Sequence, residues 1–202
     1  MRKAIAFVLV MLGLTLTVSA CTGKAKQTED KKMETTQNLK GKKVLVAYFS
    51  WSGNTQDAAN YIAKKTGADE FRIETVKPYP TEYDACTKIA EVEKNTDARP
   101  DIKGKVADMD KYDVVFVGAP VWYYTAPMAV FTFLEQYDFK GKTVIPFTTC
   151  YTAEYETLND IVKKTPGAKH LDGLVIKTHE INAKEMPAKH AQIDTWLKKL
   201  GF

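Results

Sequence analysis

The chain has 202 residues, of which 45% are hydrophobic and 27% are charged, a composition typical of one soluble domain with a full apolar core. The formal charge of +4 falls to +2 without Arg2 and Lys3, which lie in a segment that we expect to be removed. No basic cluster interleaved with aromatic residues occurs in the sequence, which argues against nucleic-acid binding.

The first 20 residues have the pattern of a secretory signal. A positive start is followed by an apolar run over residues 4–18 that is short for a membrane-spanning helix. The run ends in Val18-Ser19-Ala20-Cys21, which resembles a bacterial lipobox. We therefore predict a lipoprotein signal peptide over residues 1–20, lipidation of Cys21, and a lipid-anchored, extracytoplasmic place in the bacterial cell envelope. A plain secretory signal with an incidental cysteine is the alternative.

Residues 21–39 are polar and almost free of large apolar side chains. They cannot bury enough apolar surface to fold, so we predict a flexible tether there and a folded domain over residues 40–202. The domain contains two cysteines, Cys86 and Cys150, for which free, partly buried thiols are favoured over a disulfide.

The apolar run at residues 44–49 predicts a strand buried on both faces, as in a parallel sheet. A short polar loop and a helical pattern follow it. A strand, a small polar loop and a helix N-terminus form a geometry that holds a phosphate, because backbone N–H groups and the helix dipole favour an anion. The loop is Ser50-Trp51-Ser52-Gly53-Asn54-Thr55. It lacks Lys, Arg and a G-x-G-x-x-G pattern, so it suits a terminal monophosphate, with an ordinary capped turn as the alternative.

Helices and strands alternate along the rest of the chain. Further strands are predicted at residues 68–75, 113–118, 142–148 and 170–177, and helices after Thr55, at about 82–94, around 130–134, at 157–165 and at the C-terminus, where Pro187 is in the first turn. This alternation predicts an α/β fold with a doubly wound five-stranded parallel sheet, in the order 2-1-3-4-5, between two layers of helices. Ligands of such sheets bind beyond the carboxyl ends of strands 1 and 3.

Two further loops reach the same edge of the predicted sheet. The loop after the third strand carries Trp122 and Tyr123, which can stack on a planar ring. In the loop after the fourth strand, Tyr151 can supply an opposite stacking face, and the backbone of Thr149 and Cys150 can meet the ring edge. Packing of one or two of these aromatic rings on the sheet edge is the alternative.

Four segments together resemble the flavodoxin-like proteins: YFSWSGNT, GAPVWYYTAP, FLEQYDFKGKTVIPF and the terminal WLKKLGF. The first is similar to the phosphate loop YFS-x-S/T-G-N-T of a bacterial subgroup, and the resemblance covers residues 42–202. It implies flavin mononucleotide (FMN) as the cofactor. By this resemblance the phosphate is held by Ser50, Trp51, Ser52, Gly53, Asn54 and Thr55, and the ring by Pro120, Val121, Trp122, Tyr123, Thr149, Cys150 and Tyr151.

The resemblance implies electron transfer, with a redox partner protein or a small-molecule electron acceptor, at a membrane reached through the lipid on Cys21. One alternative is an FMN-dependent quinone or nitro-compound reductase that uses NAD(P)H. Another is a non-redox binding lipoprotein that has lost the flavin, suggested by a third loop without the glycines of its relatives. We expect no catalytic residue and no metal site, because the three histidines lack metal-ligand spacing.

Overall fold

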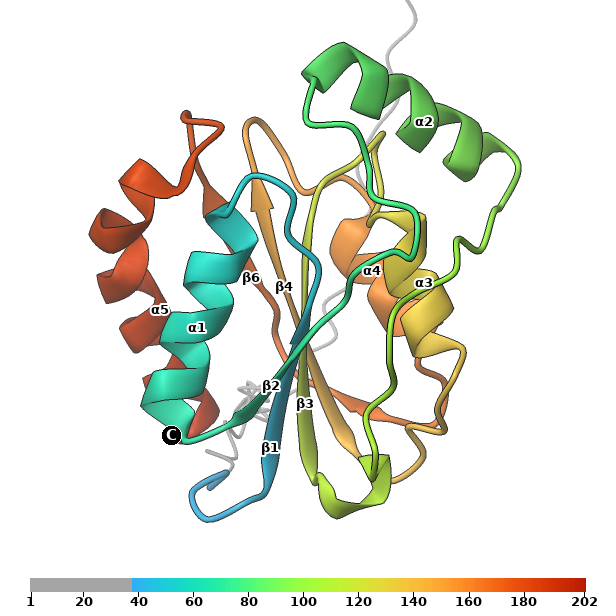
Figure 1. Ribbon diagram of the computed structural model, residues 1–202. Helices are drawn as coiled ribbons and strands as arrows, with labels where there is room; N and C mark the ends of the chain where they lie inside the picture. Colours follow the sequence, from blue (N-terminus) through green and yellow to red (C-terminus); the bar gives the residue numbers. More distant parts are fainter. Residues whose placement is uncertain (1–37) are drawn as a thin grey trace, which may run out of the picture. The chain divides into compact units, whose positions relative to one another are not determined.

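A parallel β-sheet forms the centre of the computed structural model, which describes residues 38–202 (Figure 1). Its strands are β1 (Val44–Tyr48), β2 (Asp69–Arg72), β3 (Val114–Pro120), β4 (Thr143–Cys150), β5 (Lys169–His170) and β6 (Leu174–Lys177). The strand order is β2-β1-β3-β4-β5, with β6 also paired to β4, and every pair is parallel. The predicted fold class and strand order are confirmed. The predicted signal peptide, Cys21 and residues 21–37 of the tether lie outside the described residues.

Helices cover both faces of the sheet (Figure 1). They are α1 (Asn54–Thr66), α2 (Tyr83–Asn95), α3 (Met128–Leu134), α4 (Thr157–Lys163) and α5 (Met186–Leu200), with 3₁₀ turns η1 (Met109–Lys111) and η2 (Ala183–Glu185). The helices α1 and α5 bury Ile62 and Trp196 in one core, which also takes Leu39 from the end of the predicted tether. The helices α3 and α4 bury Phe133 and Ile161 in the other. Helix α2 lies beyond the carboxyl ends of the strands, on the side of α3 and α4.

The single strand predicted at residues 170–177 is wrong in one respect, because the structure divides it into β5 and β6. Between the pairs Val144–His170 and Phe147–Leu174, the edge strand has one residue more than β4. The interruption lies at Pro146, which has no N–H to donate to a neighbouring strand. The two short strands together occupy the one edge position that the sequence predicted.

The long polar segment between α2 and η1 lies alongside the residues that come just after β2. Val76 N donates to Asp101 O (2.8 Å), and Lys103 N donates to Glu74 O (2.7 Å). These antiparallel contacts bring Lys103 close to the carboxyl end of β2, near the loop that follows β1.

Some features are absent from residues 38–202. Within this range no helix has the length and apolar character needed to span a bilayer. The same residues contain no group of three or more His, Cys, Asp or Glu that is arranged to hold a metal ion. Both cysteines of the domain, Cys86 and Cys150, are buried free thiols.

Candidate functional site

The loops that follow β1, β3, β4 and β6 meet around one cavity of about 430 Å³, which we call the loop cavity. Helix α2 closes one side of it. Ten of the predicted site residues line it: Trp51, Ser52, Asn54, Pro120, Val121, Trp122, Tyr123, Thr149, Cys150 and Tyr151. Of the other three, Thr55 is buried in the first turn of α1, Gly53 is the N-cap residue just before α1, and Ser50 borders a second cavity. The structure thus brings the three predicted loops together.

The loop after β1 leaves its backbone donors free. Gly53 precedes α1 with a φ of 97°, a left-handed conformation that disfavours any residue with a Cβ, and no side chain caps the helix. Among the hydrogen bonds within residues 38–202, none is donated by the backbone N–H groups of residues 51–56. Free N–H groups at the start of a 13-residue helix form an anion-binding site.

Two buried polar atoms in this loop also lack partners within the described residues. They are Ser50 Oγ, in a residue that is 6% exposed, and Asn54 Oδ1, in one that is 7% exposed. Leaving such a group unpaired is unfavourable, so both atoms indicate a missing ligand or water. The loop is held in place from β4, because the hydroxyls of Thr55 and Thr149 are 2.8 Å apart and hydrogen-bonded.

The aromatic residues divide between packing and the cavity wall. The ring of Trp122 packs edge-on against Phe49 and Tyr79, with centroids 5.1 and 4.8 Å away, and still lines the loop cavity. Trp51 lines it too, with Nε1 donating to Pro80 O at 2.8 Å. Tyr151 is 67% exposed at the mouth. Trp122 therefore packs against core residues, as the alternative predicted, and also forms part of the cavity wall.

The loop after β3 ends in a tight turn. Tyr123 and Tyr124 both have positive φ, 45° and 72°, and the backbone groups of Trp122 and Thr125 exchange two hydrogen bonds. Residues with a Cβ at these angles store backbone strain, so the turn needs outside support. Helix α2 supplies it, because Tyr123 Oη donates to Glu91 and Lys94 Nζ lies over both tyrosine rings.

The two cysteines on the cavity wall are poor nucleophiles. Burial raises the pKa of the Cys86 thiol to about 11, and Glu93 adds to the rise. Burial also raises the pKa of Cys150, with Glu154 acting in the same direction and Lys177 against it. Both thiols are therefore protonated at neutral pH, and thiolate chemistry is disfavoured.

Sequence reasoning missed two parts of the cavity wall. One is a face of α2 that consists of Tyr83, Cys86, Thr87 and Ala90, and the other is the segment after β6 that consists of Thr178, His179, Glu180 and Ile181. The first set has helical spacing, i, i+3, i+4 and i+7, which marks one face but not what it covers. The second set follows the carboxyl end of β6. Because ligands of such sheets bind beyond the carboxyl ends of the strands, this segment could have been predicted in the same way as the other loops.

The family model described as flavodoxin matches residues 43–197. The chain belongs to the flavodoxin family. The solved structures similar to this flavodoxin include a candidate flavoprotein from Bacteroides eggerthii (31% identity, covering 80% of this chain and 99% of that chain, TM-score 0.67). A second candidate flavoprotein, from Bacteroides uniformis, is 29% identical, covers 79% of this chain and 99% of its own chain, and has a TM-score of 0.67. A Lactobacillus acidophilus flavoprotein, solved in complex with FMN, has 20% identity, 77% and 99% coverage and a TM-score of 0.61. Among curated proteins none matches.

The residues of this flavodoxin fit a phosphorylated planar ligand. The first loop offers free N–H groups, the unpaired Ser50 Oγ and a helix N-terminus for the phosphate. The unpaired Asn54 Oδ1 can accept a hydrogen bond from a ligand hydroxyl. The cavity beside them is lined by aromatic side chains from four segments, and its volume is within the ~300–1,000 Å³ of small-molecule sites.

Proposed function

We propose that this flavodoxin binds FMN in the loop cavity and transfers electrons at the outer face of the membrane. The observation that carries the proposal is the pair of unpartnered polar atoms, Ser50 Oγ and Asn54 Oδ1, in the loop after β1, which borders a cavity lined by aromatic side chains. A phosphate and its neighbouring hydroxyls would satisfy the first loop, and a planar ring would fill the aromatic part.

The bound FMN would supply electron transfer in steps of one or two electrons. The chain's own residues bind and orient it. Thr55 and Thr149 hold the first loop against β4, and α2 holds the turn that carries Tyr123. The exposed ring of Tyr151 lies at the cavity mouth, where it can cover one face of the flavin.

The N-terminal sequence supports the lipid anchor. Cys21 follows a signal-like segment, and the mostly polar residues 22–38 separate it from Leu39, which packs in the core of the domain. A chain of this length reaches roughly 60 Å when fully extended. Metabolic labelling with a radioactive fatty acid, in the native chain and in a Cys21→Ser variant, tests this part alone, because only the native chain should carry the label.

The FMN site is tested by removing the unpaired hydroxyl. We expect Ser50→Ala to weaken FMN binding about 10- to 100-fold, the range of one hydrogen bond to a charged group. The stability of the ligand-free protein should not fall, because the hydroxyl has no partner there. Calorimetric titration with FMN and urea unfolding measure the two quantities.

The matched control is Thr157→Val, which removes another buried hydroxyl that has no partner in the described structure. Thr157 lies at the start of α4, outside the loop cavity, so FMN affinity should be unchanged. A native protein that is colourless after purification and takes up no added FMN would overturn the proposed function.

A further inference from the structure

The charged side chains of the domain are unevenly distributed. Residues 38–202 contain 23 Lys and Arg against 22 Asp and Glu, so the domain as a whole is almost neutral. Seven exposed lysines nevertheless lie together at the end of the sheet where β1 begins, and we call them the lysine face. They are Lys40, Lys42, Lys43, Lys64, Lys65, Lys198 and Lys199.

Three segments that are distant in the chain form the lysine face. Residues 40–43 precede β1, residues 64–65 lie in the last turn of α1, and residues 198–199 lie in the last turn of α5. Residues of all three segments line one hollow, to which Lys42, Lys65 and Phe202 contribute. Figure 1 shows the C-terminus beside the end of α1 and near the start of β1, whereas α2 lies at the opposite end of the strands.

The lysines of this face outnumber the acids beside them. Three of them form ion pairs with aspartates, at N–O distances of 2.9 to 3.9 Å: Lys42–Asp113, Lys43–Asp69 and Lys65–Asp194. These side chains are between 43% and 52% exposed, so water screens the pairs and the lysines stay available to another anion. The other four form no ion pair within residues 38–202, which leaves an excess of positive charge even with the terminal carboxylate included. Nearer β3 and β4, three lysines balance three aspartates: Lys111, Lys140 and Lys142, and Asp108, Asp110 and Asp138.

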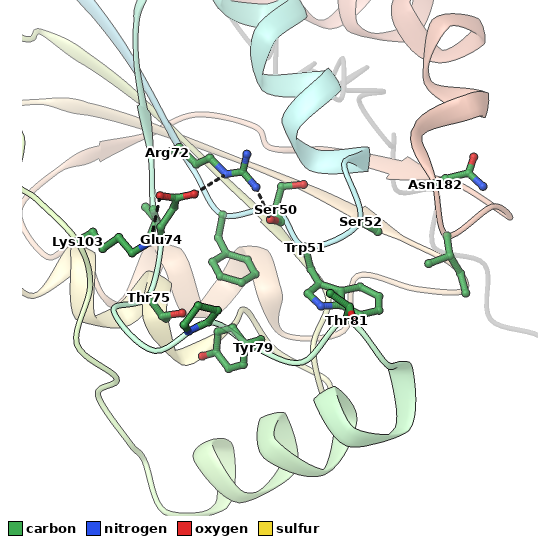
Figure 2. Close-up of a pocket in the computed structure, with 14 residues that line it drawn as sticks. Ser50, Trp51, Ser52, Arg72, Glu74, Thr75, Tyr79, Thr81, Lys103 and Asn182 are labelled. Atoms are coloured by element: carbon green, nitrogen blue, oxygen red, sulfur yellow. Dashed lines mark hydrogen bonds and ion pairs between the residues drawn. The ribbon is translucent and has the colours of Figure 1, made fainter.

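At the carboxyl end of β2, in contrast, the chain pairs its own cations. Arg72 and Lys103 share the Glu74 carboxylate, with Nε–Oε1 and Nζ–Oε2 distances of 3.6 and 3.8 Å (Figure 2). Because the whole domain is almost neutral, the part outside the lysine face and its three paired aspartates carries a net negative charge. The domain is therefore electrically polar, with its positive end at the start of β1.

The chain enters the domain at this positive end. The described part begins at residue 38, Leu39 packs in the core, and residues 40–43 lead into β1. In the proposed function Cys21 holds the lipid, and residues 22–38 connect it to the domain. A flexible chain of that length has a root-mean-square span of roughly 20–25 Å. The lysine face is thus the part of the domain that lies next to the anchor.

We propose that the lysine face docks on the anionic phospholipid headgroups of the membrane that holds the chain. Clusters of about 4–8 lysines beside a membrane anchor bind anionic lipids. The proposal rests on the lipid anchor in the proposed function. The loop cavity then faces away from the lipid, because the eight residues of β4 alone span about 26 Å between the two ends of the sheet. Docking would present the cofactor site to a soluble partner.

The mature chain without its lipid tests the docking directly. Residues 21–202 with Cys21→Ser keep every described residue and both cores. This protein is sedimented with vesicles of phosphatidylcholine alone, and with vesicles of equal parts phosphatidylcholine and phosphatidylglycerol. We expect binding to the anionic vesicles only, and its loss at about 1 M salt, where the Debye length is ~3 Å.

A triple variant tests the lysine face. Lys64→Gln, Lys198→Gln and Lys199→Gln remove exposed charges, and glutamine has a helix propensity close to that of lysine. Binding to the anionic vesicles should weaken about fivefold for each lysine removed. The matched control has the same net charge and replaces exposed lysines at the opposite end of the strands: Lys77→Gln, Lys88→Gln and Lys184→Gln. It should bind like the native sequence.

Acetylation of the vesicle-bound protein, measured for each lysine by mass spectrometry, tests the orientation. Lys40 and Lys199 should be protected by anionic vesicles, and Lys88 on α2 should react as it does in solution.

The outcomes separate the docking from the proposed function, because no measurement involves FMN and the fatty-acid label on Cys21 reports the anchor by itself. Lack of binding to anionic vesicles overturns the docking and leaves the anchor and the FMN site standing. Equal weakening by the two triple variants, or binding without protection of Lys40 and Lys199, also overturns it. So does binding to soluble polyphosphate with none to anionic vesicles, since the lysine face would then serve a different polyanion.

Discussion

A half-buried carboxyl lies behind the aromatic wall of the loop cavity. Tyr79 Oη donates to Glu93 Oε2 at 2.7 Å, and the Tyr79 ring packs edge-on against Trp122, which lines the cavity. Burial raises the pKa of Glu93, and the hydrogen bond from Tyr79 opposes part of the rise. Burial therefore disfavours the charged carboxylate in the folded state, and the hydrogen bond from Tyr79 reduces that penalty.

This carboxyl predicts a pH dependence of stability. Because the folded-state pKa of Glu93 lies above its ordinary 4.5, its contribution is most favourable below pH 4.5 and is lost as pH rises through the folded-state pKa. Glu93→Gln keeps an acceptor for Tyr79 but does not ionise. Urea unfolding from pH 3.5 to 8 should therefore show the native protein losing stability relative to this variant as pH rises.

Tyr79→Phe sharpens this test. The substitution removes the hydrogen bond that lowers the pKa of Glu93, so the loss of stability should extend to higher pH. A native protein and a Glu93→Gln variant whose difference in unfolding free energy is constant over the whole pH range would contradict the interpretation.

At the scale of elements, one carboxylate joins three segments on the face of the sheet that α3 and α4 cover. Glu135, which caps the end of α3, accepts hydrogen bonds from Arg99 Nε and Nη2 at 2.6 and 2.9 Å. Arg99 belongs to the segment between α2 and η1. Lys164, which ends α4, donates to the same carboxylate at 2.7 Å. The guanidinium and then the ammonium lower the pKa of Glu135 to about 2.

The lowered pKa of Glu135 makes stability depend on pH in the opposite direction from the raised pKa of Glu93. Stability from Glu135 should be fully present above pH 4.5 and lost as pH falls toward 2. We expect Glu135→Gln to destabilise the protein at pH 7 by about 1 kcal/mol or less, because the side chain is 40% exposed and screened. Acid unfolding followed by circular dichroism should show that difference vanish near pH 2, and a difference that persists there would contradict the ion-pair explanation.

At the scale of the whole domain, the loop cavity is formed by segments that are distant in the chain. The residues that line it lie between 51 and 181: they are at the ends of β3 and β4, in the segments that follow β1, β3, β4 and β6, or in α2. A ligand that contacts all of these segments stabilises the folded state and has no such site in the unfolded chain.

FMN should therefore raise the thermal midpoint of the domain. At a free FMN concentration 100 times Kd the gain is about 2.7 kcal/mol, which corresponds to roughly 5–10 °C for a domain of this size. Differential scanning calorimetry of the native protein measures the shift. At the same FMN concentration Ser50→Ala should give a clearly smaller shift, and equal shifts would place the binding outside the first loop.

The strand order and the three loops could be predicted because their signals are local. Continuous apolar runs mark strands buried on both faces, and alternation with helices leaves few topologies. The phosphate loop was visible because Gly53 and its polar neighbours stand between such a run and a helix. The break between β5 and β6 was not predicted, because it depends on which residue of β4 lies beside the edge strand.

The sequence by itself thus determined the family, the order of the sheet and the edge of the sheet at which the predicted loops gather. Only the tertiary structure decided which side chains line the cavity there. It added the face of α2 and residues 178–181 to the loop cavity, turned Trp122 edge-on against Tyr79, and brought Arg72 within hydrogen-bond distance of Ser50 O in the first loop. The physical reason is that periodicity records whether a residue is buried, whereas a binding site depends on which distant segments pack together.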